Sequence, residues 1–137
     1  MSDDAIEAAF GRVGLWGRAC GGTGACLNTE LVASEWSQGE MQLLALARAL
    51  LVPSKILVLD EAASSVDDKT ETIMQGVIDT EWRQRTAISV LHRFAHIRQF
   101  DRVAVLSWGR LVECDTPQAL LGRQSAFREL YHAFNAG

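Results

Sequence analysis

The apolar run ILVLD, residues 56–60, constrains the fold of this chain more than any other stretch. It is short, rich in β-branched residues and closed by an acid, a pattern typical of a strand buried on both faces of a parallel sheet. Pro53 ends a helix predicted over residues 38–51, and a second helix is predicted over 68–82. A further apolar run, TAISVL at residues 86–91, follows. This alternation of strand and helix predicts an α/β fold with a parallel sheet.

The remaining elements are predicted from turn and cap signals. Asp3 or Asp4 is expected to cap a helix over residues 5–13, and a short helix is expected over 94–100. Residues 101–114 predict two strands around the Trp108–Gly109 turn. Thr116 and Pro117 are the expected cap and first residue of a helix, and a last helix is predicted over 125–134. In the helix over 38–51, the apolar residues that recur at helical spacing are Met41, Leu44, Ala45, Ala47 and Leu51.

Composition excludes several classes of protein. A chain of 137 residues with 48% hydrophobic and 22% charged residues is expected to form one ordered domain. The net charge of -4 and the lack of a basic block argue against nucleic-acid binding. No apolar stretch is long enough to cross a bilayer, so direct membrane insertion by this chain is not expected. The three cysteines form neither a zinc pattern nor a disulfide framework, which predicts free thiols.

Two acids stand where a parallel sheet binds ligands. Asp60 closes the first predicted strand and Glu61 follows it. Because ligands lie beyond the carboxyl ends of parallel strands, Asp60 could support a Mg²⁺ ion and Glu61 could polarise a water molecule. The alternative is that both acids only cap the following turn.

Two other features also admit a functional and a structural interpretation. Ser37 and Gly39 begin the helix over 38–51, whose N–H groups suit an anionic phosphate, although an ordinary capped helix explains them equally. His92 follows the second strand, where it could hold a phosphate or water or make a structural hydrogen bond.

As an ordered set, these stretches resemble the nucleotide-binding domain of ABC transporters, most closely the second such domain of C-subfamily, multidrug-resistance-associated exporters. WSQGE resembles the signature motif, ILVLDE the Walker B strand, SSVD the D-loop and LHR the switch-histidine loop. The resemblance implies a partial P-loop NTPase-like fold, a parallel sheet flanked by helices. Residues 1–52 would contribute part of the helical subdomain with the signature helix, and 53–137 the C-terminal part of the ATPase core.

The resemblance also implies roles for single residues. Asp60 would support Mg²⁺ through a water molecule. Glu61 would be the general base, His92 would sense the γ-phosphate, and Asp67 would communicate across a dimer of nucleotide domains. The γ-phosphate of an ATP held mainly by the opposite domain would be contacted by Ser37, Gln38, Gly39 and Glu40.

A phosphate-binding P-loop requires Gly-x-x-x-x-Gly-Lys followed by Ser or Thr. The glycine cluster GRACGGTGACLN contains no lysine, so it is rejected as such a loop. The resemblance therefore implies the C-terminal portion of one nucleotide domain, not competent for hydrolysis alone and prone to aggregate through an unpaired strand edge. Glu40 departs from the usual glutamine of the signature motif and should weaken the anion site.

The implied partners are ATP, a second nucleotide-binding domain and the transmembrane domains of a transporter. The expected location is the cytoplasmic face of a membrane, reached through the rest of the transporter, with the fragment itself soluble. One alternative is a non-catalytic fragment that pairs with an intact nucleotide domain through its signature face. Another is an unrelated enzyme that uses Asp60, Glu61 and His92 as a metal site, which no further ligand cluster supports.

Overall fold

The computed structural model describes residues 2–21, 27–28, 30–60, 66–83, 85–91, 94 and 96–135. The chain divides into two compact units, Met1–Val90 and Leu91–Gly137. The boundary expected between residues 52 and 53 falls inside the first unit, and that subdomain division stays a prediction.

The first unit contains the predicted parallel strands. Its elements are α1 (Asp3–Arg12), α2 (Trp16–Cys20), the 3-10 turn η2 (Ala33–Glu35), α3 (Gln38–Leu50), β1 (Ile56–Asp60), α4 (Asp68–Glu81) and β2 (Thr86–Val90). Strands β1 and β2 pair in parallel, with Ile56 opposite Thr86 and Asp60 opposite Val90. Helices and a small parallel sheet of this kind confirm the predicted α/β class.

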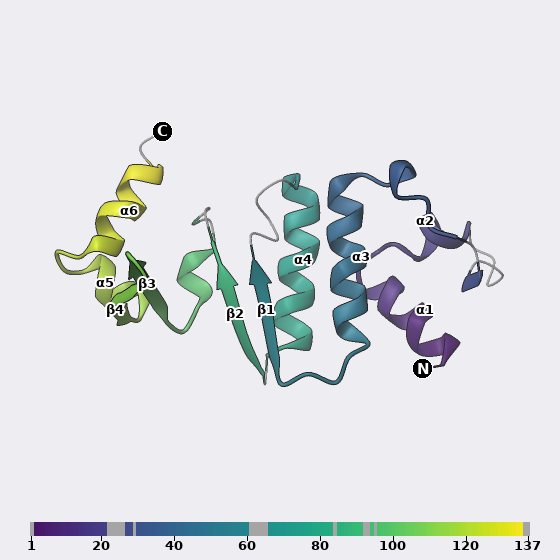
Figure 1. Cartoon of the computed structure of the whole chain (residues 1–137), viewed down its shortest axis with the longest axis horizontal. Helices are drawn as coiled ribbons and strands as arrows, with labels where there is room; N and C mark the ends of the chain where they lie inside the picture. Colours follow the sequence, from purple (N-terminus) through teal and green to yellow (C-terminus); the bar gives the residue numbers. More distant parts are fainter. Residues whose placement is uncertain are drawn as a thin grey trace. The chain divides into compact units, whose positions relative to one another are not determined.

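Helices α3 and α4 pack against each other and lie side by side in Figure 1. Both helices begin at the end of the unit toward which the arrows of β1 and β2 point (Figure 1). The N-termini of two helices and the carboxyl ends of two strands therefore gather at one end. This is the end at which a parallel α/β sheet presents its ligand-binding groups.

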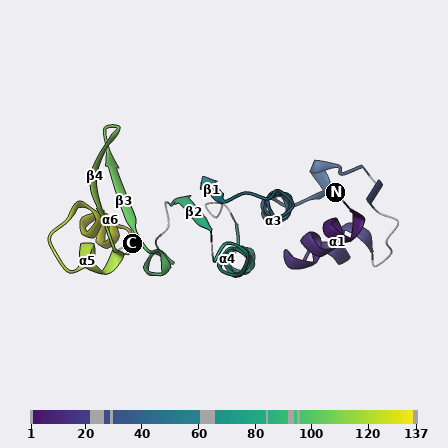
Figure 2. The ribbon, with the colours of Figure 1, turned by 90° about the horizontal axis from the view of Figure 1, so that it is seen from below.

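The core of the first unit lies between the helices and one face of the sheet. Figure 2 shows α4 against that face. The opposite face is uncovered: Val58 and Ile88, which pair in register, are 63% and 51% exposed. The prediction of strands buried on both faces is therefore wrong for this unit. The buried core consists of Ala9, Val13, Leu15, Leu43, Leu46, Ala47, Leu57, Val66, Met74, Val77 and Trp82.

Two local predictions are corrected by the helix geometry. Ser2, rather than Asp3 or Asp4, caps α1, and its hydroxyl accepts a hydrogen bond from the backbone N–H of Ala5. In α3 the buried side chains are Leu43, Leu46 and Ala47, so of the apolar residues predicted at helical spacing Ala47 is buried while Met41 is 39% exposed. Several adjacent apolar residues in α3 fit more than one helical face, so the packing partner decides which of them is buried.

The second unit contains η3 (Ile97–Gln99), β3 (Val103–Ser107), β4 (Arg110–Asp115), α5 (Pro117–Leu121) and α6 (Ala126–Asn135). Strands β3 and β4 form an antiparallel hairpin, and Trp108 and Gly109 both adopt positive φ, of 50° and 74°, in its two-residue turn. Positive φ at both turn positions matches the right-handed twist of a hairpin. Thr116 caps α5 and Pro117 begins it, as predicted. The buried core consists of Ile97, Val105, Leu120 and Phe127.

The cysteines differ from the prediction at one position. Cys114 is free and exposed, whereas Cys20, at the end of α2, is disulfide-bonded. The prediction of a free thiol at Cys20 is wrong, because an odd number of cysteines excludes complete pairing but not a single bridge.

Candidate functional site

Ser37 begins α3 with a reciprocal pair of hydrogen bonds. Its hydroxyl Oγ accepts from the backbone N–H of Glu40 at 3.2 Å, and its own backbone N–H donates to Glu40 Oε2 at 2.8 Å. This capping box satisfies two backbone donors that a helix start otherwise leaves open. The backbone N–H of Ser37 is the main cause that lowers the pKa of the Glu40 carboxyl, so Glu40 is anionic at neutral pH.

Arg18 of α2 contacts both sides of this turn. Its Nε lies 3.2 Å from Glu40 Oε1, and its Nη2 donates to the backbone carbonyl of Glu35 at 2.7 Å. The guanidinium also lies over the ring of Trp36, 4.9 Å from the ring centroid. One side chain thereby contacts residues 35, 36 and 40, which flank the Ser-Gln-Gly stretch.

Gly39 joins the start of α3 to the start of α4. The residue is buried, and a Cβ placed on it would lie 3.1 Å from Thr70 Oγ1 and 3.2 Å from Thr70 Cγ2. The Thr70 hydroxyl donates to Asp67 Oδ2 at 2.8 Å, and the Thr70 backbone N–H donates to Asp67 Oδ1 at 3.0 Å. Asp67 thus caps α4, and the Thr70 N–H is the main cause that lowers the pKa of Asp67. The signature-like turn and the D-loop-like aspartate therefore meet through Thr70.

Asp60 occupies the last position of β1 and is exposed. Mg²⁺ is commonly held by one or two carboxylates together with water and substrate phosphates, so this single accessible carboxylate fits the ion. Glu61 and His92 lie outside the described residues, and their roles stay predictions. Within the described part of the chain, no group of three or more His, Cys, Asp or Glu side chains could hold a metal.

Two residues of this site escaped the sequence analysis. Arg18 precedes Glu40 by 22 residues, and no local pattern connects them. Thr70 stands three residues after Asp67, and this spacing of a cap and its first-turn partner is a recognisable signal.

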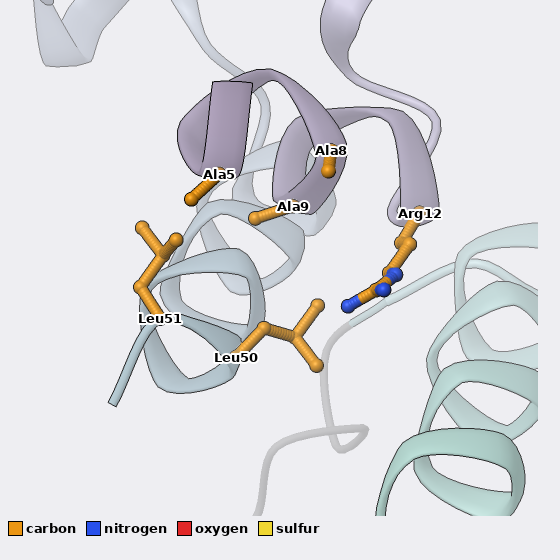
Figure 3. A pocket seen from close by; sticks show the side chains of 6 residues that line it. All are labelled: Ala5, Ala8, Ala9, Arg12, Leu50 and Leu51. Carbon is orange, nitrogen blue, oxygen red and sulfur yellow. The ribbon is translucent and has the colours of Figure 1, made fainter. Parts of the chain in front are cut away.

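A pocket of about 480 Å³ lies elsewhere in the first unit. Figure 3 shows Ala5, Ala8, Ala9 and Arg12 of α1 on one side and two leucines of the α3 C-terminus on the other. Arg12 is engaged by Glu81, with Nε and Oε1 3.2 Å apart. The lining contains no carboxylate, hydroxyl or imidazole, so this pocket lacks the groups for acid–base chemistry.

Sequence comparison shows which known proteins this chain resembles. The family described as ABC transporter matches residues 2–64. The chain is 42% identical over 129 residues to ABC transporter atnG of Emericella nidulans, covering 94% of this chain and 8% of that protein. It is 46% identical over 92 residues to putative ABC transporter C family member 15 of Arabidopsis thaliana, covering 67% of this chain and 9% of that protein.

A solved structure agrees over both units. The structure of a bacterial Atm1-family ABC exporter with ATP bound matches 99% of this chain and 24% of its own, with a TM-score of 0.85 and 30% sequence identity. The parallel strand pair and its helices therefore define part of an α/β ATPase domain. The chain belongs to the ABC transporter family, as part of a nucleotide-binding domain.

The match has a limited extent in the relatives. The chain spans less than a tenth of the length of the two transporters named above, at 8% and 9%. In the part of the chain that the structure describes, no helix has the length and apolar character needed to cross a membrane.

Proposed function

We propose that this chain is part of the ATP-hydrolysing module of an ABC exporter and that its residues serve two different ATP molecules. The turn at Ser37 contacts an ATP held mainly by an opposite nucleotide domain. Asp60 and Glu61 serve the ATP held by the P-loop of their own domain. Support comes from the ordered motifs and from the family of the chain's relatives, which are named as ABC transporters.

The capped turn at Ser37 is the observation on which the proposal mainly rests. Ser37 Oγ accepts a hydrogen bond from Glu40, which leaves its O–H proton to donate to a phosphate oxygen. The backbone N–H groups of Gln38 and Gly39 lie in the first turn of α3, where helix donors have no partner within the helix. A hydroxyl, backbone donors and the positive end of the helix dipole together suit a γ-phosphate.

Glu61, His92 and Asp60 act on the ATP that is held by the P-loop of their own domain. Glu61 takes a proton from a water molecule, whose oxygen forms a bond to the γ-phosphorus while the bond from that phosphorus to the β-phosphate oxygen breaks. ADP then leaves with the electrons of the broken bond, and His92 holds the γ-phosphate in position. Asp60 would hold Mg²⁺ through water, and the ion would offset the charge that develops on the phosphates. Asp67 communicates across the dimer of nucleotide domains, and within this chain its carboxylate is held by the hydroxyl of Thr70.

Hydrolysis and transport need more than these residues. The P-loop comes from the rest of a nucleotide domain, the second face from an opposite nucleotide domain, and the route for the transported substrate from transmembrane domains. The working location is accordingly the cytoplasmic face of a membrane, and the chain by itself does not hydrolyse ATP.

The test uses the purified chain with Mg-ATP, alone and mixed with an intact nucleotide domain of a related ABC exporter. The partner has its own catalytic glutamate replaced by glutamine, so ATP remains intact while association is measured by fluorescence transfer. We expect ATP-dependent association that Ser37→Ala weakens about fivefold or more, on the order of one lost phosphate hydrogen bond. Ser2→Ala is the matched control, since Ser2 caps α1 in the same manner.

Two outcomes would contradict the proposal. Association that Ser37→Ala and Ser2→Ala affect equally would remove the role of the turn at Ser37. Hydrolysis by the chain alone that disappears in Glu61→Gln would show that the chain needs no partner.

A second candidate function is a non-catalytic fragment that only pairs with an intact nucleotide domain. The observation that favours it is the complete formation of the turn at Ser37 within this chain, with its cap and with Gly39 seated on Thr70. The two functions differ once the chain is joined to the P-loop half of a related nucleotide domain. Hydrolysis that depends on Glu61 in this fusion supports the catalytic function, and its absence in a folded, ATP-binding fusion supports the second.

A further inference from the structure

Glu40 presents a problem for a turn that faces phosphate. Its carboxylate lies in the first turn of α3, where a negative charge repels an incoming anion. One carboxylate oxygen, Oε2, accepts a hydrogen bond from the backbone N–H of Ser37. This bond holds the carboxylate beside the turn and prevents the side chain from rotating into solvent. The charge is therefore held close to the donors proposed to meet the γ-phosphate.

Arg18 occupies the other oxygen of that carboxylate. Its Nε lies 3.2 Å from Glu40 Oε1, so the pair has no net charge. The guanidinium is also held from two other directions, by the carbonyl of Glu35 and by the ring of Trp36. Three contacts on one planar group restrict its rotation, and this distinguishes Arg18 from a surface arginine that meets a single carboxylate.

We propose that Arg18 is a charge-compensating positioning residue of the signature turn, which cancels the charge of Glu40 and so keeps the turn able to face the phosphates of ATP. This inference rests on the proposed function, because it takes the turn at Ser37 as the phosphate contact. According to this proposal, loss of Arg18 weakens ATP-dependent association because the negative charge of Glu40 is then no longer compensated. Arg18 and Glu40 then act as one unit.

The test is a double-mutant cycle on the ATP concentration that gives half-maximal association of the chain with the glutamine-substituted partner domain. We expect Arg18→Gln to raise that concentration about fivefold, the order of magnitude for one uncompensated charge a few ångströms from the ligand in a solvent-exposed site. Glu40→Gln keeps an oxygen for the Ser37 N–H and should lower the concentration about twofold to threefold, since it leaves Arg18 positive beside the phosphate. The Arg18→Gln, Glu40→Gln double variant again has no net charge at this pair, so its half-maximal ATP concentration should return to within a factor of two of that of the unsubstituted chain.

Arg12→Gln is the matched control. Arg12 and Glu81 form an ion pair of the same length, 3.2 Å, with side-chain exposures of 51% and 27% against 48% and 28% for Arg18 and Glu40. Removal of this second pair should leave the half-maximal ATP concentration within a factor of two. Arg18→Lys, which keeps the charge but loses the planar fork, should retain most of the affinity.

The outcomes separate a charge effect from a structural one. A double variant that associates as weakly as Arg18→Gln alone, or a loss with Arg18→Lys as large as with Arg18→Gln, would overturn the inference. Should Arg18→Gln fail to fold by circular dichroism, Glu40→Gln alone decides, and an unchanged or raised ATP concentration would contradict compensation. Ser37→Ala is measured in parallel: if it has no effect, the proposed function fails, and if only the Arg18 variants have none, the inference alone fails.

Discussion

The N-termini of α3 and α4 lie side by side and are built in opposite ways. Helix α3 starts with the neutral hydroxyl of Ser37, and the acid of its first turn, Glu40, is paired with Arg18. Helix α4 starts with the carboxylate of Asp67, and its first turn adds Asp68 and Glu71. The positive end of the α4 dipole is therefore met by acids of the chain itself, while that of α3 is met by a neutral cap.

This difference assigns the two helix ends to different tasks. The N-terminus of α3 offers a hydroxyl and backbone donors, whereas the N-terminus of α4 is capped by the carboxylate of Asp67. The α4 end is thus a structural support: Asp67 fixes Thr70, and Thr70 packs against Gly39. The turn of α3 that we propose to face phosphate is therefore packed against a helix whose own cap is a carboxylate.

The largest expected effect on ATP-dependent association comes from giving α3 an aspartate cap like that of α4. Ser37→Asp provides a good helix cap, so the folded state should be retained. The new carboxylate would face the phosphates, and we expect ATP-dependent association with a partner domain to weaken about tenfold or more. The measurement is the half-maximal ATP concentration, and circular dichroism checks the helix content.

Ser2→Asp is the control for that change, because it places the same acid at the same position of α1. It should leave association unchanged within a factor of two. If both aspartates weaken association to the same extent, the contrast between the two helix ends has no bearing on ATP.

A smaller effect, on the free energy of unfolding, is expected at the contact between the N-termini of α3 and α4. Gly39→Ala adds a methyl group 3.1–3.2 Å from Thr70 atoms, and Asp67 restricts the movement of Thr70. Gly76→Ala makes the same change within α4 where nothing lies within 4 Å. We expect Gly76→Ala to stabilise by about 0.5–1 kcal/mol through helix propensity and Gly39→Ala to destabilise by about 1 kcal/mol through overpacking.

Urea denaturation followed by circular dichroism measures both free energies of unfolding. Equal stabilisation by the two alanines would show that Thr70 yields easily and that the two helix ends are not in firm contact.

The sequence predicted one side of this contrast. Ser37 and Thr116 were predicted as caps because a cap is a local interaction between residues a few positions apart, whereas Asp67 was predicted only as a D-loop residue and the structure shows it as the cap of α4. The parallel pairing of β1 and β2 followed from the alternation of apolar runs and helices. Arg18 could not be found in this way, since its contact with Glu40 depends on the path of the chain between them.

Faces and exposure were predicted less well than element positions. An apolar run such as Ile56–Asp60 does not reveal whether one face or both are covered, and in the first unit one face is open, with Val58 63% exposed. The same holds for α3, whose many apolar residues do not reveal which face is covered: Ala47 is buried, whereas Met41 is 39% exposed. Glu61 and His92, predicted from motif order, remain predictions.

The smallest expected effect is the acid sensitivity of the two caps. The pKa values of Glu40 and Asp67 lie below their ordinary values of 4.5 and 3.8, in each case chiefly because a backbone N–H donates to the carboxylate. A depressed pKa means that the stabilisation is complete above the ordinary value and is lost as the pH falls through the depressed one.

Thermal unfolding between pH 7 and pH 3 should therefore show a steeper acid decline in the unsubstituted chain than in the Glu40→Gln, Asp67→Asn double variant. Both amides keep an oxygen that accepts the backbone N–H but cannot be protonated in this range. Because both carboxylates are exposed to solvent, the difference between the two curves should be small and confined to the acid side. Curves that decline in parallel would mean that neither cap contributes to acid sensitivity, and the two helix ends would then differ in charge without differing in their response to pH.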